Sequence, residues 1–144
     1  MGRYEKILAA VVVGLLATAT ATATSTEQRT PVQVVEHHIG AFKKADIDQV
    51  VADYAANAVM VLSTGTFSGR VELRKMFETY FAQDKSHLAW EATAESRGNG
   101  LVIEHWTVYR GRPNERSGTD VIVVRGGKVV FHSMGPDAAC KEKS

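Results

Sequence analysis

The sequence predicts an α+β fold: a cone-like, curved sheet of mixed or antiparallel strands that packs against three N-terminal helices and encloses a pocket. Apolar residues recur with helical spacing between about residues 30 and 82, interrupted by a short run rich in β-branched residues at 57–62. After residue 88, apolar and polar residues alternate in runs that glycine-rich turns separate. Helices followed by hairpin-linked strands indicate α+β rather than alternating α/β architecture. A long twisted sheet curls enough for helices to close its concave side.

The first helix is expected to begin at Pro31. Thr30 can cap it, proline suits the first helical position, and Gln33 completes a capping box. A second helix is expected from Asp46, with an apolar stripe that reaches Tyr54. A buried strand over 57–62, a loop over 65–69 and a third helix over about 70–82 follow.

The remaining chain predicts a meander of strands. The strands are expected at about 88–94, 101–110, 117–125 and 128–134. Gly126 and Gly127 suit a two-residue turn that needs positive φ at both positions. Such a meander places successive strands side by side in one antiparallel sheet.

The N-terminal segment has the pattern of a signal peptide. Basic residues precede a short apolar run, and alternating alanines and threonines follow. We therefore expect export to the periplasm or the exterior, with no stable membrane association after cleavage; an uncleaved anchor is the alternative. The expected organisation is a signal peptide over 1–23, a linker over 24–29, a folded domain over 30–135 and a polar tail over 136–144.

Charge and cysteine content exclude some classes of protein. The formal net charge of the 144 residues is +1, and no basic cluster suggests a nucleic-acid partner. The single cysteine, Cys140, excludes an intramolecular disulfide. The histidines include no His-x-x-x-His or Glu-x-x-His pair, so the sequence predicts no metal site.

Three stretches resemble the nuclear transport factor 2-like superfamily, including its SnoaL-like polyketide cyclases and ketosteroid isomerases. They are AFKKADIDQVVADYAANAVMV at 41–61, FSGR at 67–70 and DVIVVRGGKV at 120–129. The resemblance covers nearly the whole chain after residue 30. It implies the fold and a homodimer, but this fold carries many unrelated activities and also non-catalytic binding modules.

The resemblance also suggests which residues form a site. In ketosteroid isomerases an aspartate base and an oxyanion tyrosine would align with Leu62 and His38, so isomerase chemistry by that pair is not expected. In SnoaL-like cyclases the acid/base aspartate and its supporting histidine resemble Asp120 and His105. No cofactor is implied, because proton abstraction next to a carbonyl needs only a base and an oxyanion donor.

Alternation along the strands leaves open which residues near 105 and 120 face the pocket. A turn centred near Pro113 places His105 almost opposite Asp120, about 5 Å apart. A register shift of one residue would instead turn Glu104 and Trp106 toward the pocket. Residues expected to line the pocket are His38, Tyr54, Leu62, Phe77, Trp90, Ile103, Tyr109 and Ile122.

These observations leave three functional hypotheses open. The first is an exported pocket protein that binds a small, mostly apolar molecule without changing it. The second is a cofactor-independent lyase, isomerase or cyclase that uses Asp120 with His105. The third is a non-catalytic, homodimeric interaction module. Every pocket role depends on an enclosed space above roughly 300 Å³.

Overall fold

The structure, a computed structural model of the chain, describes residues 28–136. Its elements in chain order are α1 (Pro31–Lys43), α2 (Ile47–Ala52), β1 (Tyr54–Leu62), β2 (Gly65–Ser68), α3 (Gly69–Gln83), the short 3₁₀ helix η1 (Ser86–Ala89), β3 (Trp90–Gly98), β4 (Leu101–Val108), β5 (Arg116–Arg125) and β6 (Lys128–Pro136). Over these described residues, no helix combines the length and apolar character needed to cross a membrane. The expected signal peptide and most of the expected tail lie outside the described residues.

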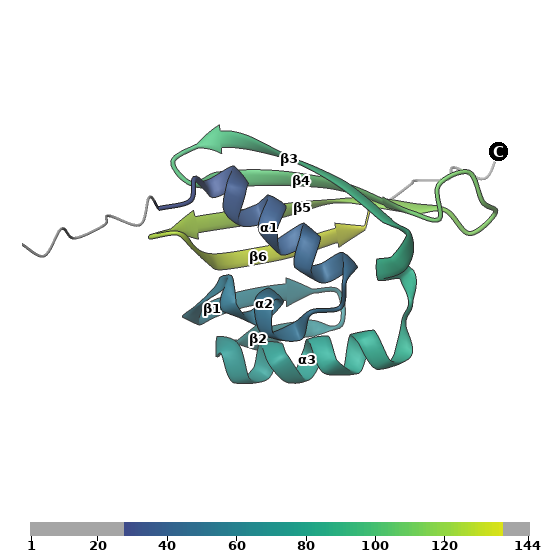
Figure 1. Ribbon diagram of the computed structural model, residues 1–144, viewed down its shortest axis with the longest axis horizontal. Helices are drawn as coiled ribbons and strands as arrows, with labels where there is room; N and C mark the ends of the chain where they lie inside the picture. The colour runs from purple at the N-terminus through teal and green to yellow at the C-terminus, as the bar shows by residue number, and fades with distance from the viewer. Residues whose placement is uncertain (1–27, 137–144) are drawn as a thin grey trace, which may run out of the picture.

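The fold is built on one curved sheet. Its strand order is β2-β1-β6-β5-β4-β3, and all neighbours are antiparallel except β1 and β6, which are parallel. α1 lies across one face of the sheet, whereas α2 and α3 lie beside β1 and β2 (Figure 1). The predicted α+β class, with a mixed curved sheet and three helices, is confirmed.

The two N-terminal helices begin as their capping residues predict. The Thr30 hydroxyl accepts from the Gln33 backbone at 3.3 Å, and the Gln33 side chain accepts from the Thr30 backbone at 2.8 Å. This is the reciprocal capping box that the sequence indicates. The Asp46 carboxylate accepts from the Gln49 backbone at 3.1 Å and so caps α2.

The second helix ends earlier than expected. Tyr54 does not continue the apolar stripe of α2 but opens β1. The reason lies at Asp53, whose buried carboxylate accepts from Arg29 at 2.9 Å and lies 2.7 Å from His37. The Asp53 carbonyl accepts from the Val129 backbone at 2.8 Å, which commits the chain to pairing with β6.

The segment expected to be a loop after residue 65 forms β2. Its pairing with β1 runs from Leu62↔Gly65 to Val59↔Ser68. The sequence suggested a loop here because glycine and serine stand at the two ends of this four-residue strand and glycine follows it. β2 leads directly into α3, which begins at Gly69 with a positive φ of 76°.

Aromatic side chains fill much of the space between the helices and the sheet. The Phe42 ring of α1 lies 5.0 Å from Trp90 and 5.2 Å from Phe81, measured between ring centroids. Phe77 stacks on Phe81 with centroids 6.1 Å apart. Aromatic rings therefore occupy much of the interior and border the same cavity as the buried polar groups.

Candidate active site

The pairing of β4 with β5 decides which residues face the interior. Glu104 lies opposite Asp120, and Val102 lies opposite Ile122. Directly paired residues share a face of the sheet, and all four of these side chains are buried. The concave face therefore carries two carboxylates side by side in an otherwise apolar wall.

The expected partnership between His105 and Asp120 is wrong. His105 pairs with Thr119, and its side chain on the outer face is 53% exposed. Its ring lies 3.1 Å from the Thr119 hydroxyl and 3.7 Å from Glu95. A shift of one residue in register turns every side chain to the other face, so the alternative that turns Glu104 and Trp106 inward is the one observed.

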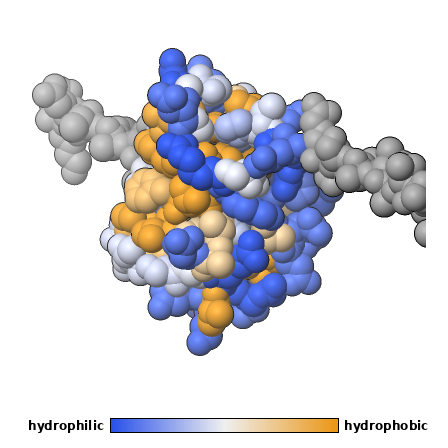
Figure 2. Space-filling view, turned by 90° about the vertical axis from the view of Figure 1, so that its left-hand side faces the viewer, coloured by the Kyte–Doolittle hydropathy of each residue, from blue (hydrophilic) through white to orange (hydrophobic). Residues whose placement is uncertain are grey.

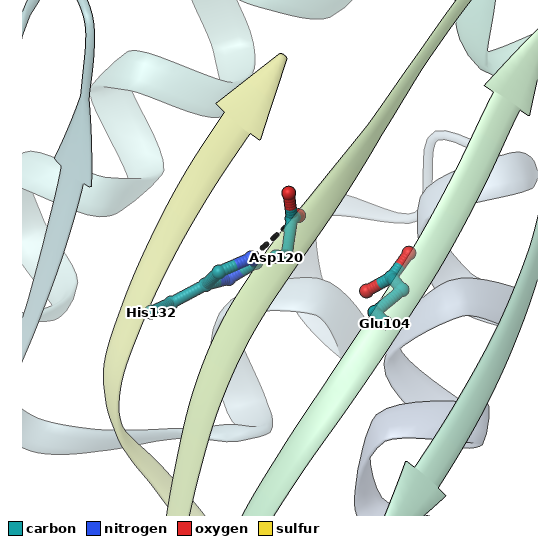
Figure 3. A group of neighbouring side chains, drawn as sticks. All are labelled: Glu104, Asp120 and His132. Atoms are coloured by element: carbon teal, nitrogen blue, oxygen red, sulfur yellow. Dashed lines mark hydrogen bonds and ion pairs between the residues drawn. The ribbon is translucent and has the colours of Figure 1, made fainter. Parts of the chain in front are cut away.

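Asp120 is the most fully bonded group in the interior. Its Oδ1 accepts from Trp106 Nε1 at 2.8 Å and from the Gly135 backbone at 3.3 Å. Its Oδ2 lies 2.9 Å from His132 Nε2 (Figure 3). Gly118 makes the first bond possible, because a Cβ at that position would overlap the Trp106 ring.

His132 connects Asp120 to Tyr54. Its Nδ1 lies 2.7 Å from the Tyr54 hydroxyl, and both side chains are buried. A carboxylate only accepts hydrogen bonds, so His132 donates to Asp120 through Nε2 and, in the neutral ring, Nδ1 accepts from the Tyr54 hydroxyl. Burial raises the pKa of Tyr54 well above its ordinary value, which keeps this hydroxyl a donor.

His132 could not be predicted as a site residue from the sequence, because a β-bulge changes the face of the sheet on which it lies. The Gly126-Gly127 turn is present with positive φ at both residues and pairs Arg125 with Lys128. Uninterrupted pairing from there would set His132 opposite Val121 on the outer face. The register shifts after Val124↔Val129, so that Val123 pairs with Phe131 and His132 shares the inner face with Ile122.

Glu104 stands beside Asp120 on the next strand. Its Oε1 accepts one bond, from Trp90 Nε1 at 3.3 Å. Burial, and secondarily the nearby charge of Asp120, raises the pKa of Glu104 to about 7. This carboxyl group is therefore partly protonated at neutral pH.

His38 projects from α1 toward the same centre. Its ring centroid lies 5.9 Å from that of His132 and 5.3 Å from that of Tyr54. Burial, followed by the proximity of His132, lowers the pKa of His38 to about 3, so the ring is neutral. Its Nδ1 is buried and has no hydrogen-bond partner among the described residues.

The enclosed space at this centre is small. The cavity has a volume of about 10 Å³, and its lining includes His38, Glu104, Asp120 and His132. This volume holds roughly one water molecule. It is far below the roughly 300 Å³ of a small-molecule pocket, because aromatic rings occupy the rest of the cone.

The residues expected to line the pocket divide into two groups. His38, Tyr54, Phe77, Trp90 and Ile122 are buried in the interior. Ile103 lies on the outer face, because the inner positions of β4 are the even-numbered ones. Leu62 lines a groove between the β1–β2 hairpin and α3, and Tyr109 lines a surface hollow beside Lys43, so neither borders the central cavity.

The fold and this centre define a class: a cone-shaped α+β protein with carboxyl, imidazole and phenol groups buried on the concave face of its sheet. The chain belongs to the SnoaL-like domain family, whose sequence profile matches residues 35–132. No curated protein matches the chain.

Solved structures share the fold at low sequence identity. A nuclear transport factor 2-like protein of unknown function from Burkholderia xenovorans is 22% identical, with a TM-score of 0.60 over 74% of this chain and 81% of that one. A candidate polyketide cyclase from Pseudomonas putida is 12% identical, with a TM-score of 0.58 over 74% and 90% of the two chains. A candidate isomerase from Bacillus subtilis is 18% identical, with a TM-score of 0.58 over 70% and 81%. At these identities the likeness establishes the fold alone.

Proposed function

We propose that this protein is an enzyme of the isomerase, lyase or cyclase type that moves a proton on a small carbonyl compound. Asp120 is the acid/base, and His132, rather than His105, orients it. The observation that carries the proposal is the buried chain Tyr54–His132–Asp120, closed by hydrogen bonds of 2.7 and 2.9 Å. Buried polar groups of this kind weaken a fold unless fully bonded, and they concentrate at functional sites.

Such a reaction also needs a group that stabilises the carbonyl oxygen of the substrate, and a buried group beside Asp120 can do this. Removing a proton next to a carbonyl creates negative charge on the carbonyl oxygen, and a donor fixed in a dry site stabilises it. The Glu104 carboxyl group, which is buried and lines the cavity, is the group placed to donate to that oxygen when it is protonated. The closed cavity of about 10 Å³ is too small for such a compound, so the proposal requires the interior to open when substrate binds.

A substrate needs an entrance, and the seam between α1 and β3 provides one. A surface groove of about 510 Å³ lies there, lined by Gly40, Ala92 and Ala94 among others. Ile39 borders both this groove and the central cavity. The proposal therefore requires that Ile39 and the adjoining part of α1 move away from β3 when substrate enters.

Deuterium exchange tests this proposal on a set of simple carbonyl compounds. A panel of cyclic ketones and β-keto esters is incubated with the protein in D₂O, and exchange of the protons next to the carbonyl is followed by NMR. We expect catalysed exchange that falls at least about 100-fold in Asp120→Asn. Catalysed exchange that survives this substitution would refute Asp120 as the base.

We also propose that the protein is exported, on the signal-peptide pattern of residues 1–23. Cell fractionation with N-terminal sequencing tests this. A mature chain outside the cytosol that starts after residue 17 supports export, and a cytosolic chain that starts at Met1 contradicts it.

A second role rests on the outer face of the sheet, which we propose as a homodimer interface. Cross-strand neighbours form an apolar area on this face: Val59, Val61, Leu101, Ile103, Val121, Val123 and Phe131. Val121 is 38% exposed at its centre. Figure 2 shows apolar surface gathered toward one side of the molecule and hydrophilic surface toward the other. Contiguous apolar surface of this kind marks interaction sites.

A further inference from the structure

We propose that Glu104, Asp120 and His132 form a binding site for one divalent transition-metal ion of the Zn²⁺ type, and that His38, which lies outside this group of three but lines the same cavity, becomes a fourth ligand when the ion binds. One potential ligand atom from each of the first three lies within 4.8 Å of the others. Bonds of about 2.0–2.4 Å place ligand atoms on opposite sides of an ion about 4–5 Å apart. The three side chains come from the adjacent strands β6, β5 and β4 and lie on the same face of the sheet, with His132 directed at Asp120 (Figure 3).

A hydrogen bond with a neighbouring aromatic side chain holds each of these three residues in place. Trp90 binds Oε1 of Glu104, and Trp106 binds Oδ1 of Asp120. His132 Nδ1 lies 2.7 Å from the Tyr54 hydroxyl. His132 Nε2 and Asp120 Oδ2 now bond to each other at 2.9 Å. When Nε2 binds the ion, the ring proton moves to Nδ1, which then donates to the Tyr54 oxygen. Partners of this kind orient metal ligands and tune their affinity.

His38 provides an independent observation. It is 5% exposed, it lines the same cavity, and its Nδ1 lacks a partner among the described residues. A buried polar atom without a partner destabilises the fold, and coordination to an ion would satisfy it. In the closed structure the cavity of about 10 Å³ has room for a single ion or water.

The donor set indicates the class of ion. Two carboxylate oxygens and two imidazole nitrogens match the ligands of Zn²⁺ and related transition ions. Mg²⁺ instead prefers oxygen ligands in an octahedron and keeps several waters, for which this cavity has no room.

This inference goes beyond the proposed function and does not depend on it. Coordination would occupy Asp120 and displace its hydrogen bond with His132, so ion and carbonyl substrate would exclude each other. We therefore expect the ion to inhibit proton transfer while it stabilises the fold.

Calorimetric titration of the chain with ZnCl₂ tests the site. The protein carries no affinity tag, and Cys140→Ser removes a competing thiol. We expect one ion per chain, together with a rise in Tm. Glu104→Gln and His38→Phe should each weaken binding by about 10–100-fold. His105→Ala and His37→Ala, which remove exposed histidines, should leave the affinity within about twofold.

If a variant folds poorly, a second measurement still tests the site. The absorption spectrum of bound Co²⁺ is recorded on protein that has no substitution in its interior. A tetrahedral spectrum from one bound ion supports the site. No binding at micromolar ZnCl₂, or binding that His105→Ala or His37→Ala abolishes, would overturn it. Neither result bears on the loss of deuterium exchange in Asp120→Asn, so the two proposals fail separately.

Discussion

Trp90 and Trp106 stack on each other inside the cone, with ring centroids 4.7 Å apart and an interplanar angle of 24°. Each indole N–H donates to a different buried carboxyl group, Trp90 to Glu104 and Trp106 to Asp120. The stack therefore fixes the spacing of the two acids. Residues that look like ordinary core aromatics in the sequence are the hydrogen-bond donors that keep the acids in place.

The bond between Trp106 and Asp120 should appear as an energetic coupling. In a double-mutant cycle of Trp106→Phe and Asp120→Asn, we expect a coupling of about 0.5–3 kcal/mol in the free energy of unfolding, measured by urea titration. Trp90→Phe with Asp120→Asn is the matched control and should couple more weakly, because Trp90 bonds to Glu104 instead. Equal couplings in the two cycles would contradict the assignment.

Glu104 should make the ion-free protein less stable as pH rises. Its pKa is about 7 in the folded protein against an ordinary value of 4.5. Between these values the folded state binds more protons than the unfolded state, so stability falls with rising pH and the loss is complete above about 7. This pKa shift corresponds to a loss of roughly 3 kcal/mol in the free energy of unfolding.

Urea unfolding at pH 5 and pH 8 in the presence of EDTA measures this effect. Glu104→Gln should reduce the difference in unfolding free energy between the two pH values. An undiminished difference in the variant would place the pH dependence elsewhere.

Ile39 should control access to the interior. Ile39→Ala removes the side chain that separates the α1–β3 groove from the cavity. We expect acrylamide to quench the fluorescence of the two buried tryptophans more strongly in this variant. Val71→Ala, at a position on α3 that is 71% exposed, is the control and should leave quenching unchanged. Identical quenching in both variants would exclude this entrance.

The outer face should mediate self-association. Val121→Asp introduces a charge at the centre of the apolar area and should convert a dimer into a monomer in analytical ultracentrifugation. Val71→Asp places the same charge on an exposed position of α3 and should not. If the unsubstituted protein is a monomer, or if the Val121→Asp variant is still a dimer, the proposed interface is wrong.

Local signals in the sequence predicted the helices well, because their determinants lie close together in the chain. Thr30, Gln33 and Asp46 cap the helices as expected, and Val34, Val35, His38, Ala41 and Phe42 form the expected buried stripe. Asp120 faces the interior as expected. Its role in catalysis remains a prediction.

The partners of Asp120 could not be predicted, because strand register depends on irregular turns. The β4–β5 connection contains Tyr109 with a φ of +57°, and the resulting pairing sets Glu104, not His105, opposite Asp120. The bulge in β6 turns His132 inward in the same way. A shift of one residue is invisible in composition and periodicity but exchanges the two faces of a strand.

His132, and not His105, is proposed to support Asp120 in proton transfer, and deuterium exchange in two matched variants tests this role most directly. Each of these histidines is replaced by glutamine, and exchange next to the carbonyl is measured in D₂O as for Asp120→Asn. We expect His132→Gln to lower the catalysed rate by about 100-fold and His105→Gln to leave it within about twofold. The reverse order, or equal rates in the two variants, would contradict it.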